Sequence, residues 1–181
     1  MRATGIVRRI DDLGRIVVPK EIRRVLRIRE GDSMELFTDT DGAIVVKKYS
    51  PFGELGNVAR QCAESIAQVS GQMTIITDRD SVIAAAGTPK HDVIGKRISK
   101  KLESILAERD LFHNNNKKSA VNITESENLE QSEQIICPII CDGEVIGSVI
   151  IATAGDSKEM SGIEEKLAIM ASKFLGRRME V

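Results

Sequence analysis

The side chains with the clearest capacity for chemistry are the cations of residues 1–50. This segment contains eleven Lys and Arg residues against eight Asp and Glu residues, which gives it a formal charge of +3. Eight of the eleven cations are arginines, and the planar guanidinium group binds phosphate through paired hydrogen bonds. The rest of the chain holds 15 of the 26 cations and 19 of the 27 anions, a charge of −4. This asymmetry favours a polyanion as the partner of the first segment, although charge counts alone fit a solvated surface equally well.

A short amphipathic helix is expected to bring several of these cations together. Pro19 suits the first position of a helix, and residues 20–26 complete two turns. At about 100° per residue the apolar side chains of this helix share one face. The opposite face carries four cations: Lys20, Arg23, Arg24 and Arg27. Like charges one turn apart repel each other in an isolated helix, and a bound polyanion would offset that cost.

Strands are predicted on both sides of this helix. The apolar residues within 6–10 and 15–18 flank a turn at 11–14, and residues 34–38 and 43–48 flank an Asp-Gly pair that is a strong hairpin signal. The resulting β-β-α-β-β unit of about 50 residues has no disulfide, metal or Trp to stabilise it, and it is too short to bury much core alone. Exchange of hairpins between two chains would supply the missing core.

Three motifs of this segment resemble the AbrB-type transition-state regulators. They are Thr-Gly-Ile-Val-Arg at 4–8, Asp-Leu-Gly-Arg-Ile-Val-Val-Pro at 12–19 and Glu-Ile-Arg-Arg-Val-Leu at 21–26. The resemblance covers about residues 1–50 and implies an intertwined dimer of swapped hairpins that binds double-stranded DNA. The DNA-facing arginines of the family lie where this chain has Arg8, Arg15, Arg23 and Arg24, and Arg9 matches a basic position beside them. Lys20 and Arg27 depart from the family pattern, but both lie on the cationic face of the predicted helix and should strengthen phosphate contact.

Such a dimer would gain affinity by neutralising phosphates, and selectivity from base edges and DNA shape. Two other interpretations remain open from the residues. One is a protein-interaction module of the related antitoxin kind, which would need a toxin-binding tail. The other is a ligand sensor whose basic first segment is incidental.

The rest of the chain reads as a mixed helix and strand domain. A boundary with Pro and Gly follows residue 50. Hydrophobic periodicity then predicts three helices, four better-defined strands and one weak strand. In chain order these are a helix at 54–69, strands at 72–77 and 81–86, a helix at 94–107, a weak strand at 119–123, a hairpin of 133–141 with 144–153, and a helix at 157–179.

Two of these helices carry apolar stripes that suit contact with other helices. On the last helix, predicted at 157–179, the apolar residues are spaced alternately 3 and 4 apart over two heptads. A second apolar stripe lies on the helix predicted at 54–69. Either the last helix packs on its own sheet, or the two stripes form a bundle with another chain. The predicted oligomerisation residues are Leu55, Val58, Cys62, Met160, Ile163, Leu167, Met170 and Phe174.

The element order of this second part resembles a GAF domain. The predicted fold class is therefore α+β: an AbrB-like swapped-hairpin domain at 1–50, a linker at 51–56, and a GAF-like regulatory and oligomerisation domain at 57–181 with an antiparallel sheet and flanking helices. Together the two parts resemble a family of sporulation regulators of endospore-forming bacteria. That resemblance implies a homotetrameric activator, repressor or both, located in the cytoplasm of the forespore at the nucleoid.

The GAF resemblance leaves an unidentified small-molecule effector open as a further partner. Its pocket would lie near Ile76, Val82, Ala84 and Ile94 and the loops around Phe112 and Ser126. The chain has only five aromatic residues and no Trp, so stacking on a purine or pigment is poorly provided for. The alternative is a second part that only oligomerises.

The sequence contains no common nucleotide-binding or catalytic motif. His91 and His113 are isolated, and Cys137 and Cys141 lie too far apart along one strand for a disulfide and lack partners for zinc. We therefore expect neither an enzyme nor a bound cofactor or metal. We also expect no membrane association, because the longest apolar run is too short to cross a bilayer.

Overall fold

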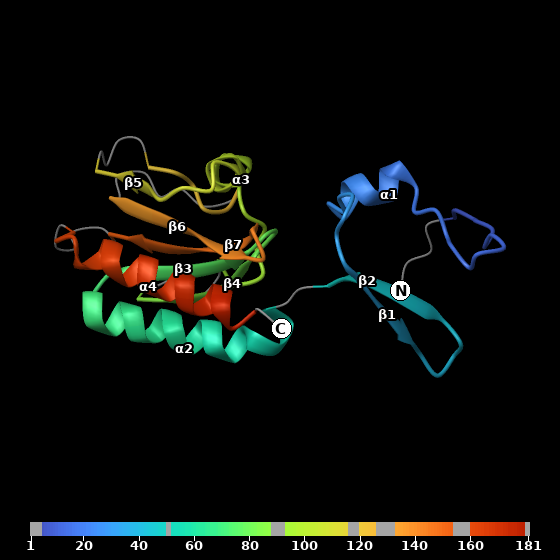
Figure 1. Cartoon of the computed structure of the whole chain (residues 1–181), viewed down its shortest axis with the longest axis horizontal. Helices are drawn as coiled ribbons and strands as arrows, with labels where there is room; N and C mark the ends of the chain where they lie inside the picture. Colours follow the sequence, from blue (N-terminus) through green and yellow to red (C-terminus); the bar gives the residue numbers. More distant parts are fainter. Residues whose placement is uncertain are drawn as a thin grey trace. The chain divides into compact units, whose positions relative to one another are not determined.

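The computed structural model describes residues 5–49, 52–87, 93–115, 120–125, 133–153 and 160–179. These residues form two compact units, 1–49 and 50–181 (Figure 1). The first unit contains a two-stranded sheet and the second a five-stranded sheet. The backbone is helical from Phe52 onward, so most of the segment predicted as a linker at 51–56 lies in a helix.

The first unit contains a short helix and one hairpin. Helix α1 spans Lys20–Val25 and starts directly after Pro19, whose extended backbone ends the preceding segment. Strands β1 (Met34–Thr38) and β2 (Ile44–Lys48) pair antiparallel, with Leu36 opposite Val46. The hairpin prediction is confirmed, and Gly42 takes the left-handed backbone that the tight turn requires.

Residues 5–19 form no strand within a single chain. The predicted strands at 6–10 and 15–18 are therefore wrong for the single chain. A closed turn is present instead, in which Asp11 N donates to Arg15 O at 3.1 Å and Gly14 N donates to Asp11 O at 3.0 Å. The apolar side chains beside it face solvent: Val7 is 87% exposed and Val17 is 73% exposed. A strand forms only where a continuous ladder of N–H and C=O groups pairs with a neighbour, and none of the described residues from 5 to 19 is in such a ladder.

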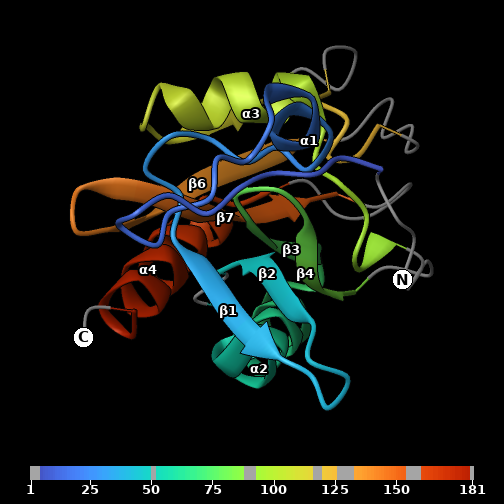
Figure 2. The same ribbon diagram turned by 90° about the vertical axis from the view of Figure 1, so that its right-hand side faces the viewer.

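The second unit is a five-stranded antiparallel sheet between helices. Its strand order is β4-β3-β7-β6-β5. Helices α2 and α4 lie on one face of the sheet and α3 lies on the other, as the two views show (Figures 1 and 2). The elements are α2 (Phe52–Ser70), β3 (Met73–Asp78), β4 (Val82–Ala86), α3 (Lys100–Ala107), β5 (Phe112–Asn114), β6 (Gln134–Cys141), β7 (Glu144–Ala152) and α4 (Ile163–Arg177).

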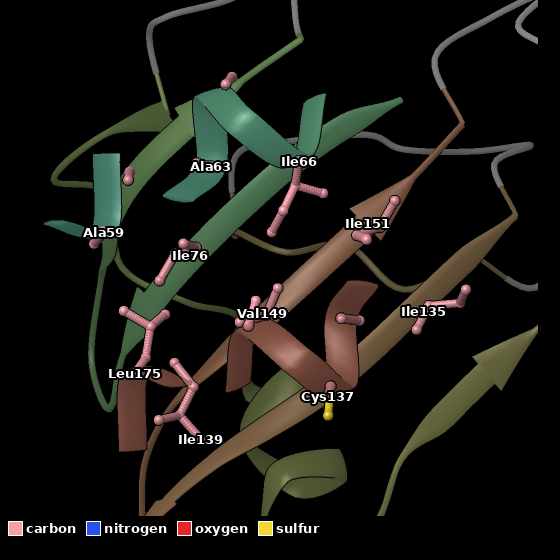
Figure 3. Packing of buried hydrophobic residues seen from close by; sticks show 14 residues of the cluster. Ala59, Ala63, Ile66, Ile76, Ile135, Cys137, Ile139, Val149, Ile151 and Leu175 are labelled. Carbon is pink, nitrogen blue, oxygen red and sulfur yellow. The ribbon is translucent and has the colours of Figure 1, made fainter. Parts of the chain in front are cut away.

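Each face of the sheet has its own hydrophobic core, because side chains alternate along the strands. On the face that α2 and α4 cover, Ile66 of α2 and Leu175 of α4 pack with residues of β3, β6 and β7 (Figure 3). On the face that α3 covers, Leu102 packs with Ile75, Ile136 and Ile150 of the same three strands. Both cores are built largely from Ile, Val, Leu and Ala, which fits the low aromatic content of 3%.

The β6–β7 hairpin lies at the centre of the sheet and follows the prediction closely. Its turn residues Asp142 and Gly143 both have positive φ, 48° and 75°, as a two-residue hairpin turn requires. The weak strand predicted at 119–123 is absent among residues 120–123. There the side chain of Gln134 accepts from Val121 N at 2.7 Å and donates to Val121 O at 2.9 Å. The edge strand β5 has only three residues and was not predicted.

The helix predicted at 94–107 is six residues too long at its start. Gly95 has a φ of +79° and Ser99 is extended, so neither can continue a helix. Ser99 instead caps α3: its Oγ accepts from Leu102 N at 3.1 Å and donates to Asn122 O at 2.5 Å. This arrangement ties the start of α3 to the segment that Gln134 holds.

The last helix is also shorter than predicted. Helix α4 begins at Ile163, after Gly162 with a φ of 81°. The predicted start at 157 falls outside the described residues. Met160 therefore lies before α4 and not on it, and its N–H donates to Glu133 Oε2 at 3.1 Å.

Candidate nucleic-acid interface

The predicted DNA-binding cations all lie in the first unit, on two neighbouring stretches of chain. Arg8 and Arg9 belong to the extended segment before the turn, and Arg15 follows that turn. Lys20, Arg23 and Arg24 lie on α1. These six residues are exposed, whereas Arg27 is half-buried.

Arg27 is placed differently from the prediction, which put it on the cationic face of a helix. Helix α1 ends at Val25, and Arg27 has a left-handed backbone with a φ of 52°. Its N–H donates to Arg24 O at 3.4 Å, and Ile28 N donates to Arg23 O at 2.8 Å. These two bonds close the end of the helix around a left-handed residue. Arg27 thus shapes the end of α1 and does not belong to its cationic face.

A partly buried ion pair holds the residues after α1 against the hairpin. Lys48 Nζ of β2 lies 3.2 Å from Asp32 Oδ2 and donates to Arg27 O at 3.5 Å. Asp32 Oδ2 also accepts from Arg29 N at 2.7 Å. The Asp32 side chain is only 4% exposed, so this pair is less screened than a surface pair. It fixes where α1 and its cations stand relative to the hairpin.

Arg15 has an anionic partner in Asp11, which the sequence predicted only as part of a turn. The carboxylate of Asp11 accepts from Arg15 Nε at 2.8 Å, from Arg15 N at 2.7 Å and from Leu13 N at 3.1 Å. These bonds hold the pKa of Asp11 below its usual value, and the bonds from Arg15 are the main cause. The Asp-x-x-x-Arg spacing around a glycine is the sequence signal that could have shown this pair.

None of the described apolar residues of the first unit is fully buried. The hairpin exposes Leu36, Ile44 and Val46, and the segments around the cations expose further aliphatic side chains. A folded unit that leaves so much apolar surface in water is suited to association with another copy or partner.

The predicted oligomerisation residues divide into two groups. Val58, Cys62, Met160 and Leu167 are partly buried against the core between α2, α4 and the sheet. Ile163, Met170 and Phe174 are exposed on α4, and they lie on one side of the helix, since they step by 7 and 4 residues. The side chain of Leu55 lies outside the described residues.

The residues predicted to line an effector pocket do not share one face of the sheet. Ile76 and Ala84 belong to the core under α2 and α4, whereas Val82 and Phe112 pack in or against the core under α3. The reason is a bulge: Ile76 pairs with Ala84 but Thr77 pairs with Val82, and an extra residue reverses the alternation of side chains. Ile94 is exposed, and Ser126 lies outside the described residues.

The described part of the chain contains no group of three or more His, Cys, Asp or Glu residues suited to a metal ion. None of its helices is both long enough and apolar enough to cross a membrane.

The arrangement of a basic AbrB-like unit followed by a GAF-like unit defines a class of DNA-associated regulators, and comparisons with known proteins place the chain in one family. Residues 54–180 match the family model of the stage V sporulation protein T C-terminal domain, described as a transcription factor. Stage V sporulation protein T of Bacillus subtilis is 43% identical over 99% of both chains. The chain therefore belongs to the stage V sporulation protein T family, as the sequence resemblance indicated.

The two units have separate relatives as well. Residues 7–54 match the model of the MazE bacterial antitoxin, described as antidote-toxin recognition. The transition state regulatory protein AbrB of Bacillus subtilis is 53% identical over 51 residues, which are 28% of this chain and 52% of that protein. A GAF domain/HD domain protein from Geobacter sulfurreducens matches 69% of this chain and 91% of its own with a TM-score of 0.56 and 16% identity. This last likeness confirms the GAF-like fold of the second unit.

Proposed function

We propose that the chain is a transcription regulator of sporulation genes that binds double-stranded DNA through its first unit. The observation that carries the proposal is the set of exposed cations on two adjacent stretches of an AbrB-like unit. The proposed contacts are Arg8, Arg9, Arg15, Lys20, Arg23 and Arg24. Arg27 is proposed only as a peripheral contact, because its side chain is half-buried.

The proposed binding form is a dimer of first units with exchanged hairpins. Residues 5–19 form no strand within one described copy, and most of the apolar side chains of this segment and of β1 and β2 are exposed. A second copy would cover both and would double the cationic surface. Phosphate contacts would then supply affinity by releasing counterions, while DNA shape and base edges would supply selectivity.

The second unit is proposed to join two such dimers into a tetramer through α2 and α4. The exposed apolar side of α4 is the basis of this assignment. Effector sensing stays a prediction from the GAF-like fold, since the predicted lining residues are divided between the two faces of the sheet. The proposed location is the cytoplasm of the forespore, at the nucleoid, because duplex DNA is the proposed partner.

The test is a titration of a labelled mixed-sequence duplex with full-length protein at several salt concentrations, read by fluorescence anisotropy. The log of the binding constant is expected to fall with log salt with a slope of about −5 to −10, which corresponds to several neutralised phosphates. The variant Arg15→Ala/Arg23→Ala should bind more weakly and give a shallower slope.

A matched control removes two exposed cations from the second unit. Lys100→Ala/Lys101→Ala changes the net charge equally, and both residues are exposed on α3. Its slope should equal that of the parent protein. An equal loss of DNA affinity and of salt slope in both double variants would mean that binding depends on net charge and not on the first unit. If the parent protein binds no DNA at low salt, the proposal is rejected.

A further inference from the structure

The contact between Asp11 and Arg15 restricts the arginine that follows the first turn. The Asp11 carboxylate binds Arg15 twice, through the backbone N at 2.7 Å and the side-chain Nε at 2.8 Å. Asp11 N in turn donates to Arg15 O at 3.1 Å. Backbone and side chain of the two residues are thus joined at both ends of the same five-residue turn, which Gly14 closes with a φ of +76°.

This contact leaves the far end of the guanidinium available. Arginine has five N–H donors in a rigid plane, and the Nε donor is the one that Asp11 binds. The Arg15 side chain is 70% exposed, whereas that of Asp11 is 37% exposed. The Nη1 and Nη2 groups can therefore bind a further pair of acceptors. Because the side chain is already held in place, less rotamer freedom is lost when they do so.

The charge of Asp11 favours one kind of acceptor over another. The Arg15 N–H groups lower the pKa of the Asp11 carboxyl, so the carboxylate is ionised at neutral pH. A phosphate bound to Arg15 would also lie close to the Asp11 carboxylate, and the two negative charges would repel each other. A base edge carries no net charge, and the O6 and N7 acceptors of guanine match two parallel donors in the major groove.

We propose that Arg15 recognises guanine in the major groove and that Asp11 is the positioning residue that makes this contact selective. The inference rests on the proposed DNA-binding function and adds to it. It divides the cations into one residue that reads sequence and others that bind phosphate. Asp11 also acts against phosphate binding at this position, so it lowers affinity for unrelated DNA.

The variant Asp11→Asn separates this role from the structure of the turn. Its side-chain oxygen still accepts from the N–H groups of Leu13 and Arg15, which hold the turn, while the amide cannot accept a charge-assisted bond from Arg15 Nε. Asp12→Asn is the matched control, because it removes the same charge at the next residue and leaves the Asp11–Arg15 pair in place. Thermal unfolding of each variant confirms that the fold is retained.

The experiment first selects duplexes from a random-sequence pool with the full-length parent protein. Binding of one enriched duplex and of a shuffled duplex with the same base composition is then measured by fluorescence anisotropy. The ratio of the two affinities is the selectivity. Both Asp11→Asn and Arg15→Ala should lower it by about 5- to 100-fold, the size expected for one bidentate base contact.

Four further results are expected if Arg15 binds guanine and Asp11 acts through Arg15. Asp11→Asn should bind the shuffled duplex as tightly as the parent or more tightly, and Asp12→Asn should keep the parent selectivity. In the Arg15→Ala background, Asp11→Asn should have no further effect on selectivity. Replacing individual guanines in the enriched duplex should reveal one position that Arg15→Ala no longer distinguishes.

Several outcomes would overturn the inference. One is unchanged selectivity in Asp11→Asn. Another is that Asp11→Asn lowers selectivity as much in the Arg15→Ala background as in the parent protein. A third is that the Arg15 contact depends on A·T pairs, which would indicate minor-groove binding. A parent protein that binds all duplexes equally also rejects it while leaving DNA binding intact. A parent protein that binds no duplex rejects the proposed function itself, so the two failures can be told apart.

Discussion

Gly176 of α4 lies directly against the backbone carbonyl of Ile140 in β6. A Cβ atom built on Gly176 would overlap the Ile140 oxygen and would come within 3.4 Å of the Ile140 carbonyl carbon. The end of α4 can approach the sheet this closely only because residue 176 has no side chain. This contact sets the depth of α4 on the sheet and so the position of its exposed apolar side.

Gly176→Ala should therefore destabilise the protein although alanine is the better helix former. Helix propensity alone would favour alanine by about 1 kcal/mol, but overpacking against backbone costs about 1–3 kcal/mol or more. We expect a net loss in the free energy of unfolding, measured by urea denaturation. Gly56→Ala in α2 is the control, since nothing lies within 4 Å of its Cβ position. It should be neutral or stabilising, and a stable Gly176→Ala protein would contradict the close contact.

Ser99→Ala should destabilise the start of α3. The variant removes the acceptor for Leu102 N and the donor to Asn122 O, and losing a helix cap typically costs about 1 kcal/mol. Ser104 of the same helix bonds only one turn back, to Lys100 O at 3.0 Å, and is exposed. Ser104→Ala should thus change the free energy of unfolding by less than about 0.5 kcal/mol. Equal effects of the two variants would show that the cap is unimportant.

The stability of the second unit should fall at alkaline pH because of the partly buried thiol of Cys62 and the buried thiol of Cys137. Burial raises the pKa of Cys62, and burial raises that of Cys137 against an opposing effect of the Ser172 hydroxyl 3.1 Å away. The folded state therefore holds the thiol proton more tightly than the unfolded chain does. Stability from this source is present below the ordinary thiol pKa of about 8.5 and is lost as pH rises through the raised folded value.

The check is urea unfolding at neutral pH and above about pH 9. Cys62→Ala/Cys137→Ala should lose less stability over that interval than the parent protein, because the two groups no longer ionise on unfolding. Cys141→Ala, which removes a thiol from the same strand as Cys137, serves as the comparison. If the free energy of unfolding of the double variant falls as much between neutral and alkaline pH as that of the parent protein, these two thiols are not the cause of the alkaline effect.

The exposed side of α4 should decide the size of the assembly. Met170→Gln/Phe174→Gln places polar groups where the structure exposes two large apolar side chains, so the monomer fold should be retained. Sedimentation velocity should then show about half the mass of the parent protein, because first-unit dimers would remain. Lys166→Gln/Lys173→Gln on the same helix should keep the parent mass. An unchanged mass for the apolar variant would place the second interface elsewhere.

Much of the molecule follows from local sequence alone. Asp41–Gly42 and Asp142–Gly143 predicted the β1–β2 and β6–β7 hairpins, because few residues tolerate the positive φ that tight turns need. Pro19 predicted the start of α1 to within one residue, because it is the N-cap with an extended backbone and not the first helical residue. The AbrB-like and GAF-like parts were also predicted, because their motifs and element order are properties of the chain.

Other features depended on contacts between distant residues. The bulge opposite Ile76 and Thr77 separates Val82 from Ala84, although alternation along the sequence puts them on one face. Helix α3 starts directly after Ser99, whose hydroxyl bonds with Asn122 O and Leu102 N, and α4 starts after Gly162. In each case the apolar pattern of the sequence extends beyond the point where the backbone changes direction, so the pattern alone misplaced the boundary or the face.

The cations show the same division. Their number and order, and the resemblance that assigns them to DNA, are determined by the sequence. Only the tertiary structure shows that Arg27 closes α1 with a left-handed backbone and that Asp11 holds Arg15. The reason is physical: residue type fixes which bonds a side chain can make, whereas the path of the backbone decides which partners come within 3 Å of it.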